Sequence, residues 1–474
     1  MADVAGPGGS GVDGAGASGS ATNRTEQLAR DLERALADRT GRPVIVGDLV
    51  RLSGGASRET WAFSAGDVDG SVRDLVLQRE RAGGATGLAA EGELLRAAAA
   101  AGVPVAEVVA TDEGRNDLGA PFIVMVRVDG ETIARRILRD ERFADARTHL
   151  ARQAGAALAA VHRVDISDFA GLADDDPLDQ LRIALDALGE PHPAFELGIR
   201  WLQRHRPPVR RRCVVHGDFR MGNLVVDQTG LRAVLDWELT HVGDPVEDLG
   251  WFCVRAWRFG SPLVAGGVGT ASDLLDGYVA GGGEPVSTEE LRWWEALGTL
   301  RWGVICIAQA ATHLSGASRS VELAAIGRRS AENEEDLLDL IDGPSAVEPV
   351  SASADAASMV EAPHDRPTAA ELLDAVGEYL DEVRSSVDGR AGFHARVAAN
   401  VVATVRRQLE LGPAQAAAHA ARLADLGVDS DAALAAAIRE GSVDGRIEQV
   451  SAAVRASVRD KLAVANPGYW HRPS

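Results

Sequence analysis

Apolar and polar positions repeat with two different periods along this chain. Between residues 44 and 127 several short runs alternate as strands do, whereas later segments repeat apolar residues every three or four positions, as amphipathic helices do. The alternation predicts strands at 44–52, from 60, at 74–78 and at 121–127. The longer period predicts helices at 25–38, 88–101, 131–139, 143–163, 271–281, 287–313, 320–341, 368–386, 391–410, 413–427, 430–440 and 445–464. A β-rich region followed by a mainly helical remainder is therefore expected.

Changes in composition indicate where the parts of the chain begin and end. Residues 1–22 are rich in Gly, Ala and Ser, with neither a basic start nor an apolar core, so we expect a disordered tail rather than a signal peptide. Residues 343–362 lack a helix period and are rich in Ala, Ser, Val and Pro, which indicates a linker. We predict a tail, a β-rich lobe, a larger helical lobe, a linker and a helical C-terminal domain at 1–24, 25–128, 129–342, 343–365 and 366–474.

The most informative chemistry lies in one loop and in the hairpin that follows it. His216-Gly217-Asp218 begins the loop, Asn223 comes five positions after the acid, and Asp236 follows two short apolar strands joined by a turn. An acid, an amide and a second acid in this order are typical of phosphoryl transfer, where the first accepts a hydroxyl proton and the others hold a metal. We therefore predict Asp218 as the catalytic base. Asn223 and Asp236 are the predicted Mg²⁺ ligands, since Mg²⁺ binds to a few hard oxygens and to phosphate.

Upstream segments fit the binding of ATP. A Gly-rich turn at 53–57 separates two predicted strands, an arrangement whose backbone N–H groups can cover phosphates. The strand ending near residue 127 is predicted to be a hinge whose backbone reads an adenine edge. The predicted nucleotide-binding residues are Ser53, Gly54, Gly55, Ala56, Ser57, Arg79, Glu91, Met125 and Arg127.

The cation for the nucleotide phosphates is the unusual part of this pattern. Lys461 is the only lysine of the chain, so the strand lysine that binds phosphates in kinases is replaced here. Its position falls near Gln78, with Arg79 next along, and strand alternation points only one of the two into the cleft. Charge favours Arg79 and register favours Gln78; we predict Arg79. Its expected helix partner is Glu91, with Glu93 as the alternative on another face of the same helix.

Charge and cysteine content narrow the class of partner. The 474 residues include 49 basic and 70 acidic side chains, a net charge of −21, which disfavours nucleic acids and anionic membranes as main partners. The three cysteines are widely spaced, odd in number and without a C-x-x-C pair, so we expect neither a disulfide scaffold nor a zinc site. No apolar run is long enough for a transmembrane helix. A cytoplasmic location is expected.

Taken in order, these motifs resemble those of small-molecule kinases of the aminoglycoside phosphotransferase and choline kinase type. The likeness spans about residues 54–343 and is greatest to the branch in which the kinase domain is fused to acyl-CoA dehydrogenases. It rests on Ser53–Trp61, Pro121–Gly130, His216–Asn223, Leu235–Glu238 and Gly243-Asp244-Pro245. The region after Arg366 resembles a helical domain of unknown function that accompanies such kinases, through its ending at 461–467.

The resemblance implies an α+β fold class: a bilobal protein-kinase-like fold with a small β-rich N-lobe and a larger α-rich C-lobe, plus a separate all-α C-terminal domain. It implies an ATP- and Mg²⁺-dependent phosphotransferase that acts on a hydroxyl group of a small molecule. A hydroxyacyl-CoA or related metabolite is favoured over an aminoglycoside. The expected partners are a second copy of the chain, in a homo-oligomer, or an acyl-CoA-metabolising enzyme.

The missing lysine supports a second hypothesis: a catalytically silent nucleotide-binding or scaffold module that acts through its C-terminal helical domain. The intact acids and amide of the loop and hairpin argue against it. A protein kinase is disfavoured because no A-P-E segment follows Asp236 and little room remains before Pro245.

Further residues near the loop are candidates for supporting roles. Arg220 lies where related enzymes place a group near the transferring phosphate, and a guanidinium there could stabilise developing charge. The alternative pairs Arg220 with Asp248 or Glu247. His216, grouped with the catalytic residues, is predicted to orient the loop rather than to transfer a proton, and Asp248 to anchor it. Glu238 is either a water-mediated aid to the metal or a structural carboxylate.

Overall fold

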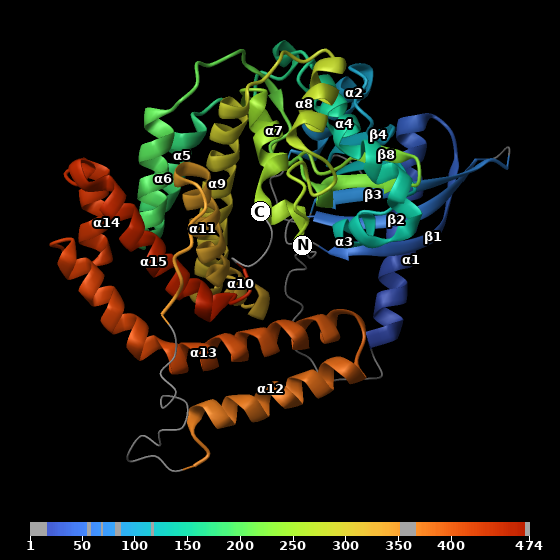
Figure 1. The fold of residues 1–474 in the computed structure, drawn as a ribbon. Coiled ribbons are helices and arrows are strands. Elements are labelled where there is room, and N and C mark those ends of the chain that lie inside the picture. Colours follow the sequence, from blue (N-terminus) through green and yellow to red (C-terminus); the bar gives the residue numbers. More distant parts are fainter. Residues whose placement is uncertain are drawn as a thin grey trace. The chain divides into compact units, whose positions relative to one another are not determined.

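The computed structural model describes residues 17–54, 58–67, 70–80, 87–114, 118–350 and 366–469 (Figure 1). Three predicted nucleotide-binding residues, Gly55, Ala56 and Ser57, lie outside these ranges. The chain forms two compact units: unit 1 comprises Met1–Asp174, Val209–Cys253 and Trp257–Ser287, and unit 2 comprises Asp175–Pro208, Val254–Ala256 and Thr288–Ser474. These units follow contacts rather than chain order, and the predicted domain boundaries stay predictions.

Unit 1 begins with an antiparallel sheet between two helices. Among the described residues the sheet has the order β1-β2-β3-β5-β4, formed by Val44–Gly54 (β1), Arg58–Asp67 (β2), Val72–Glu80 (β3), Val108–Glu113 (β4) and Pro121–Val126 (β5). Helix α1 (Ala17–Thr40) packs on one face, where Phe122 and Val124 join its apolar core. Helix α2 (Leu88–Ala100) packs against β4 and β5, with Ile123 beside Gly92. Because side chains alternate along a strand, α1 and α2 cover opposite faces.

The rest of unit 1 carries the predicted catalytic loop. Its helices are Ala134–Arg139 (α3), Ala144–Val161 (α4), Val246–Cys253 (α7) and Ala271–Ala280 (α8). Two small antiparallel pairs frame the loop: Cys213–Val215 (β6) with His241–Gly243 (β9), and Leu224–Asp227 (β7) with Gly230–Val234 (β8). The β7–β8 hairpin occupies the place where the sequence predicts two short strands around a turn.

Unit 2 is helical over its described residues. Its helices are Pro177–Leu188 (α5), Pro193–Arg204 (α6), Thr288–Leu314 (α9), Val321–Ile326 (α10), Ser330–Asp342 (α11), Ala369–Ser386 (α12), Gly389–Asp425 (α13), Asp431–Glu440 (α14) and Ile447–Ala465 (α15). One apolar core joins α6 and α11 to α13, α14 and α15; it includes Leu197, Leu338, Leu423, Ile438, Val454 and Val458. Beside this core, Glu335 of α11 forms ion pairs with Arg455 and Arg459 of α15. The C-terminal helices therefore share their core with α6 and α11.

Helix α13 corrects one prediction. Two helices were expected, at 391–410 and 413–427, because proline has no N–H and its ring crowds the preceding turn. The structure instead continues one helix, Gly389–Asp425, through Pro413, and Figure 1 shows a single long ribbon that changes direction along its length. The pattern also missed β4, α5 and α6. Both missed helices begin with proline at the first helical position, where its fixed φ is favourable.

The α+β fold class is confirmed: a five-stranded antiparallel sheet comes first in the described chain, and helices make up most of the described residues after it. Two further predictions differ from the structure: the single helix expected at 320–341 is divided into α10 and α11 by a 3-10 segment at Gly327–Arg329, and α1 begins at Ala17, within the expected tail. The remaining predicted helices and strands correspond to observed elements, with ends that differ by a few residues. In the described part of the chain, no helix has both the length and the hydropathy that are needed to cross a bilayer.

Candidate active site

A buried carboxylate anchors the predicted catalytic loop. Asp248 in α7 accepts hydrogen bonds from the backbone N–H groups of His216 at 2.7 Å and Gly217 at 2.9 Å. His162, after α4, lies 3.2 Å from Asp248 through Nε2 and 3.0 Å from the Tyr278 hydroxyl through Nδ1. Burial would raise the pKa of Asp248, but the hydrogen bonds and charges of His162 and His216 outweigh burial and lower that pKa. The anchoring role predicted for Asp248 is confirmed.

Gly217 and His216 shape the first turn of the loop. Gly217 has φ +79°, and a Cβ there would lie 2.3 Å from the Leu239 carbonyl oxygen, so only glycine fits. The buried His216 ring contacts Leu235 O through Nε2 at 3.0 Å and accepts from Asp218 N–H through Nδ1 at 3.2 Å. Burial lowers the pKa of His216 and keeps the ring neutral. Both ring nitrogens are engaged within the protein, which suits the predicted orienting role.

Three side chains converge on the carboxylate of Asp218. Asn223 Nδ2 donates to Asp218 Oδ2 at 2.7 Å and to the Asp218 carbonyl oxygen at 2.9 Å. Trp251 Nε1, in α7, donates to Oδ1 at 2.9 Å. Arg220 Nε lies 3.1 Å from both carboxylate oxygens. The direction in which this carboxylate points is therefore fixed by the protein itself.

Arg220 is held between the carboxylate and an aromatic surface. Its guanidinium carbon lies 5.1 Å from the ring centroid of Trp257, within cation–π range. A Cβ on Gly222 would lie 2.4 Å from Arg220 Nη1, so glycine makes room for the guanidinium. The alternative that paired Arg220 with Asp248 or Glu247 is wrong, because its ion pair is with Asp218.

The β7–β8 hairpin brings Asn223 and Asp236 to one place. Leu235, the residue directly before Asp236, donates its N–H to the Asn223 carbonyl oxygen at 2.8 Å. Asp236 has φ +65°, a left-handed conformation that non-glycine residues seldom adopt and that clusters at functional sites. Since Asn223 Nδ2 is bound to Asp218, Asn223 Oδ1 is the amide atom left to face a metal.

The charges around Asp236 fit a divalent cation. Its pKa is raised to about 6 by the protein atoms that crowd its carboxylate and by Glu238, Asp218 and Glu91, while Arg58 offsets part of this rise. Because the side chain keeps an exposed surface, the repulsion from the neighbouring carboxylates raises this pKa more than the crowding does. Amide and carboxylate oxygens beside excess negative charge suit Mg²⁺. Within the described ranges no three His, Cys, Asp or Glu side chains gather to hold a metal alone, so phosphate oxygens and water would complete the coordination.

An arginine that the sequence reasoning missed completes the sheet side of the site. Arg58 begins β2, and its Nη2 lies 2.8 Å from Glu91 Oε2 of α2 and 3.7 Å from Glu238 Oε2. The side chains of Arg58 and Glu91 are only 11% and 8% exposed. Burial raises the pKa of Glu91 more than the charge of Arg58 lowers it. A signal existed in the sequence: Arg58 directly follows the Gly-rich turn in a chain almost without lysine.

The structure does not bring Arg79 and Glu91 together. Arg79 has the same strand parity as Leu75 and Leu77, which belong to the core under α1. It lies opposite Glu59 in the β2–β3 register and forms an ion pair with it at 2.8 Å. Gln78 has the opposite parity and so faces the α2 side, but it carries no charge. The partner of Glu91 is therefore Arg58, and Glu93 forms its ion pair with Arg96.

The other predicted nucleotide contacts lie near the ends of two strands, β1 and β5. Ser53 and Gly54 end β1 and pair with Thr60 and Glu59 of β2. Met125 is paired within the sheet to both β3 and β4. Arg127 N–H donates to Asp74 O at 2.9 Å, so an adenine would have to use other backbone groups of this segment.

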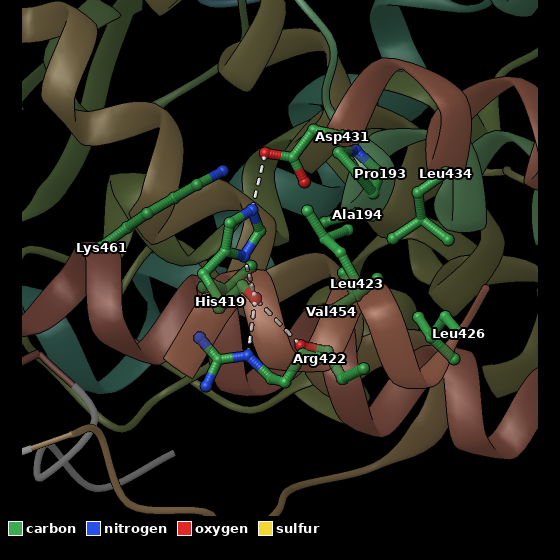
Figure 2. A pocket seen from close by; sticks show the side chains of 13 residues that line it. Pro193, Ala194, His419, Arg422, Leu423, Leu426, Asp431, Leu434, Val454 and Lys461 are labelled. Carbon is green, nitrogen blue, oxygen red and sulfur yellow. Dashed lines mark hydrogen bonds and ion pairs between the residues drawn. The ribbon is translucent and has the colours of Figure 1, made fainter. Parts of the chain in front are cut away.

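Unit 2 contains a small cavity between its C-terminal helices and α6 (Figure 2). His419 contacts Asp431 and Ser457 at its polar side, and apolar side chains such as Leu423 and Val454 line the remainder. Its volume of about 20 Å³ holds about one water molecule. The cavity is too small for a nucleotide, and none of its lining residues is among the predicted site residues.

Comparisons with known proteins agree with this geometry. Residues 48–294 match the phosphotransferase enzyme family (APH), and residues 385–469 match a domain of unknown function, DUF6285. Acyl-CoA dehydrogenase family member 10 of Mus musculus is 30% identical over 241 residues, which cover 46% of this chain and 21% of the mouse protein. Acyl-CoA dehydrogenase family member 11 of Rattus norvegicus is 43% identical over 60 residues, 12% of this chain and 8% of the rat protein.

A solved structure shows the same fold. A candidate aminoglycoside phosphotransferase of Ralstonia eutropha superposes with a TM-score of 0.54 at 22% identity, over 67% of this chain and 98% of the other. The chain spans about a fifth of the mouse relative's length. The phosphotransferase match covers over half of the chain and includes Asp218, Asn223 and Asp236. The chain therefore belongs to the phosphotransferase enzyme family.

Proposed function

We propose that this chain is an ATP- and Mg²⁺-dependent kinase that transfers a phosphoryl group to a hydroxyl group of a small molecule. The observation that carries this proposal is the single hydrogen-bonded unit of Asp218 and Asn223, with Asp236 beside it on the hairpin. Family membership supports the same reaction class. An acid for the acceptor and two oxygen ligands for a metal are the protein groups that phosphoryl transfer needs.

In this mechanism the side chains mainly position and neutralise. Asp218 receives the proton of the acceptor hydroxyl and aligns that hydroxyl with the phosphoryl group. Asn223 connects the base to the metal position, because its Nδ2 holds Asp218 while its Oδ1 and the carboxylate of Asp236 would hold the metal. Arg220 adds positive charge where charge develops on the phosphoryl group. Mg²⁺, when bound, would neutralise the nucleotide phosphates.

For the acceptor we propose a hydroxyacyl-CoA or a related metabolite. The support is the likeness to the two acyl-CoA dehydrogenase family members, which the chain matches over only part of their length. An acyl-CoA-metabolising enzyme is the corresponding candidate partner. Aminoglycosides are the second choice, because the solved relative named for them supports the fold alone at 22% identity.

A catalytically silent nucleotide-binding module is the competing function. Its support is the absence of lysine from the phosphotransferase region. The retained acids, and the way Asn223 orients Asp218, favour catalysis instead.

The test is ATP binding followed by turnover. Thermal stabilisation by ATP and Mg²⁺ is measured first, and hydroxyacyl-CoAs, choline-like amines and aminoglycosides are then screened for the mass gain of one phosphoryl group. Asp218→Asn is expected to lower transfer by roughly 10²- to 10⁴-fold while ATP still binds. Asp227→Asn, which changes a partly exposed carboxylate of the same hairpin, is the control. Slow ATP hydrolysis that is equal in wild type and Asp218→Asn, with no acceptor modified, would leave the silent module as the better description.

A further inference from the structure

The phosphates of a nucleotide need a cation on the sheet side of the site. In kinases a strand lysine binds these phosphates and forms an ion pair with a glutamate of the neighbouring helix. Here the helix glutamate is present as Glu91 of α2, while the only lysine of the chain, Lys461, lies in α15. An arginine must therefore do this work if the site binds ATP.

The strand register excludes the obvious candidate on β3. Arg79 lies on the face of the sheet that α1 covers and forms an ion pair with Glu59. Glu91 belongs to α2, which covers the opposite face, so Arg79 cannot be its partner. Gln78 lies on the same face of the sheet as α2 and Glu91, but its side chain carries no charge. The face that carries Gln78 continues onto β2 through its partner Thr60, and two residues before Thr60 on the same face is Arg58.

Arg58 has the contacts that a phosphate-binding cation needs. Its Nη2 lies 2.8 Å from Glu91 Oε2, as the strand cation and helix acid do in kinases. Its Nε makes no hydrogen bond to any described residue although it is buried. A guanidinium has five N–H donors in a planar fork that matches phosphate oxygens, so the contacts with Glu91 and Glu238 leave donors for a ligand.

The local charge balance points the same way. Arg58 faces Glu91 and Glu238, and the charges of Glu238 and Glu91 act on Asp236 as well. Nucleotide phosphates would add negative charge to a site that already has an excess of it. Arg58, whose side chain is 11% exposed, contacts both carboxylates, and Glu238, at 3.7 Å, is the more weakly held of its two partners.

We propose that Arg58 takes the place of the phosphate-binding lysine, from β2 instead of β3, with Glu91 as its fixed partner. Nε and the remaining N–H groups of Arg58 bind oxygens of the nucleotide phosphates. When the phosphates bind, Arg58 loses its contact with Glu238 and keeps its ion pair with Glu91. This inference rests on the proposed function, because it assigns a residue to the nucleotide of that reaction.

The experiment compares nucleotide affinity, measured by calorimetry with ATP and Mg²⁺, across wild type and its variants. Arg58→Met is expected to weaken ATP binding roughly 10- to 100-fold, the loss of hydrogen bonds to a charged group, and Arg58→Lys is expected to recover part of it. Arg51→Met, which removes an exposed arginine of the same sheet, is the matched control and should bind as wild type does. Arg79→Met tests the rival position.

A double variant separates a ligand contact from a structural ion pair. Arg58→Met leaves Glu91 buried without its cation and can lose stability, whereas Arg58→Met/Glu91→Gln removes both charges. If Arg58 binds phosphate, the double variant regains thermal stability but keeps the weak ATP affinity. Recovery of wild-type affinity in the double variant overturns the proposal, as does a loss of affinity in Arg79→Met that Arg58→Met does not share. Wild-type protein that binds no ATP at all refutes the proposed function itself, a result distinct from either.

Discussion

Arg220 Nε lies 3.1 Å from both carboxylate oxygens of Asp218, so one N–H group is shared between two acceptors. Asn223 and Trp251 donate to the same carboxylate at 2.7 Å and 2.9 Å. The bond from Arg220 is the longest of the three, so we expect an acceptor hydroxyl that approaches Asp218 to compete with Arg220 first. Arg220 would then be free to turn toward the phosphoryl group while Trp257 still supports its guanidinium.

This relationship predicts a catalytic rather than a binding defect for Arg220→Met. Turnover is expected to fall roughly 100-fold, as when one charge-stabilising donor is removed from an active site. The affinity for ATP should change little, because Arg220 lies beside the base. Steady-state kinetics with separate kcat and KM values measure the difference. Arg232→Met, an exposed arginine of the β7–β8 hairpin that is paired with Asp227, is the control; an equal loss in both variants would contradict the assignment.

The raised pKa of Asp236 predicts a pH dependence of opposite sign to that of an ordinary ion-paired acid. Between about pH 4 and 6 the folded protein holds a proton that the unfolded chain has released, so this residue's contribution to stability falls as the pH rises through about 6. Asp236→Asn should therefore raise the melting temperature of the nucleotide-free protein above pH 6, with the gain shrinking toward pH 4. Binding of Mg²⁺ with ATP to wild type should weaken about tenfold per pH unit below 6, since one proton competes with the metal.

The control for this experiment lies on the same hairpin. The slight burial of Asp227 would raise its pKa, but hydrogen bonds from Thr229 and the charge of Arg232 outweigh burial and lower it. Asp227→Asn should therefore lower the melting temperature at neutral pH, with the loss disappearing as the pH falls. Melting curves that show the same sign for both variants would refute the charge assignment at Asp236.

The buried anchor of the loop predicts a loss of stability for Asp248→Ala. The change leaves the N–H groups of His216 and Gly217 and the His162 ring without their acceptor, and we expect a loss of about 3 kcal/mol in the free energy of unfolding. Urea unfolding measures it. Asp276→Ala, which breaks an exposed pair with Arg152, should cost less than about 1 kcal/mol. Similar values for the two would mean that Asp248 does not anchor the loop.

The continuous helix through Pro413 predicts a stabilising substitution. Pro413→Ala restores an N–H donor for the carbonyl of Leu409 and is expected to raise the unfolding free energy of the full chain by about 1 to 3 kcal/mol. Gly412→Ala has open space around its new Cβ and should gain up to about 1 kcal/mol from helix propensity. A loss of stability in Pro413→Ala would indicate that the helix is broken at the proline, as the sequence pattern predicted.

The geometry of the loop and hairpin could be predicted from the sequence because the segments involved are neighbours in the chain. Asp218 and Asn223 are separated by one tight loop, and a short hairpin is enough to return Asp236. Alternating and helical patterns likewise located most strands and helices, since each pattern is repeated within one element. The anchoring role of Asp248 was predicted from its resemblance to the acid that holds this loop in related kinases.

Arg58 could not be found in this way because its role depends on long-range register. The pairing of Arg79 with Glu59 becomes visible only when β2 and β3 are aligned, and the contact of Arg58 with Glu91 requires α2 to pack against that face. Pro413 misled the pattern because tertiary packing can outweigh the cost of one proline. Strand β4 was missed because its register and burial come from pairing with β5.

The shared core of unit 2 has different boundaries from the two family matches. The phosphotransferase match ends at residue 294 and the DUF6285 match begins at 385, yet Leu197 and Leu338 are buried by side chains of α13, α14 and α15. A chain that lost these helices would expose an apolar face on α6 and α11, and such a face favours association unless its residues become polar. Removing the last helices of this chain would therefore have to be accompanied by substitutions on α6 and α11, because these helices complete the same apolar core.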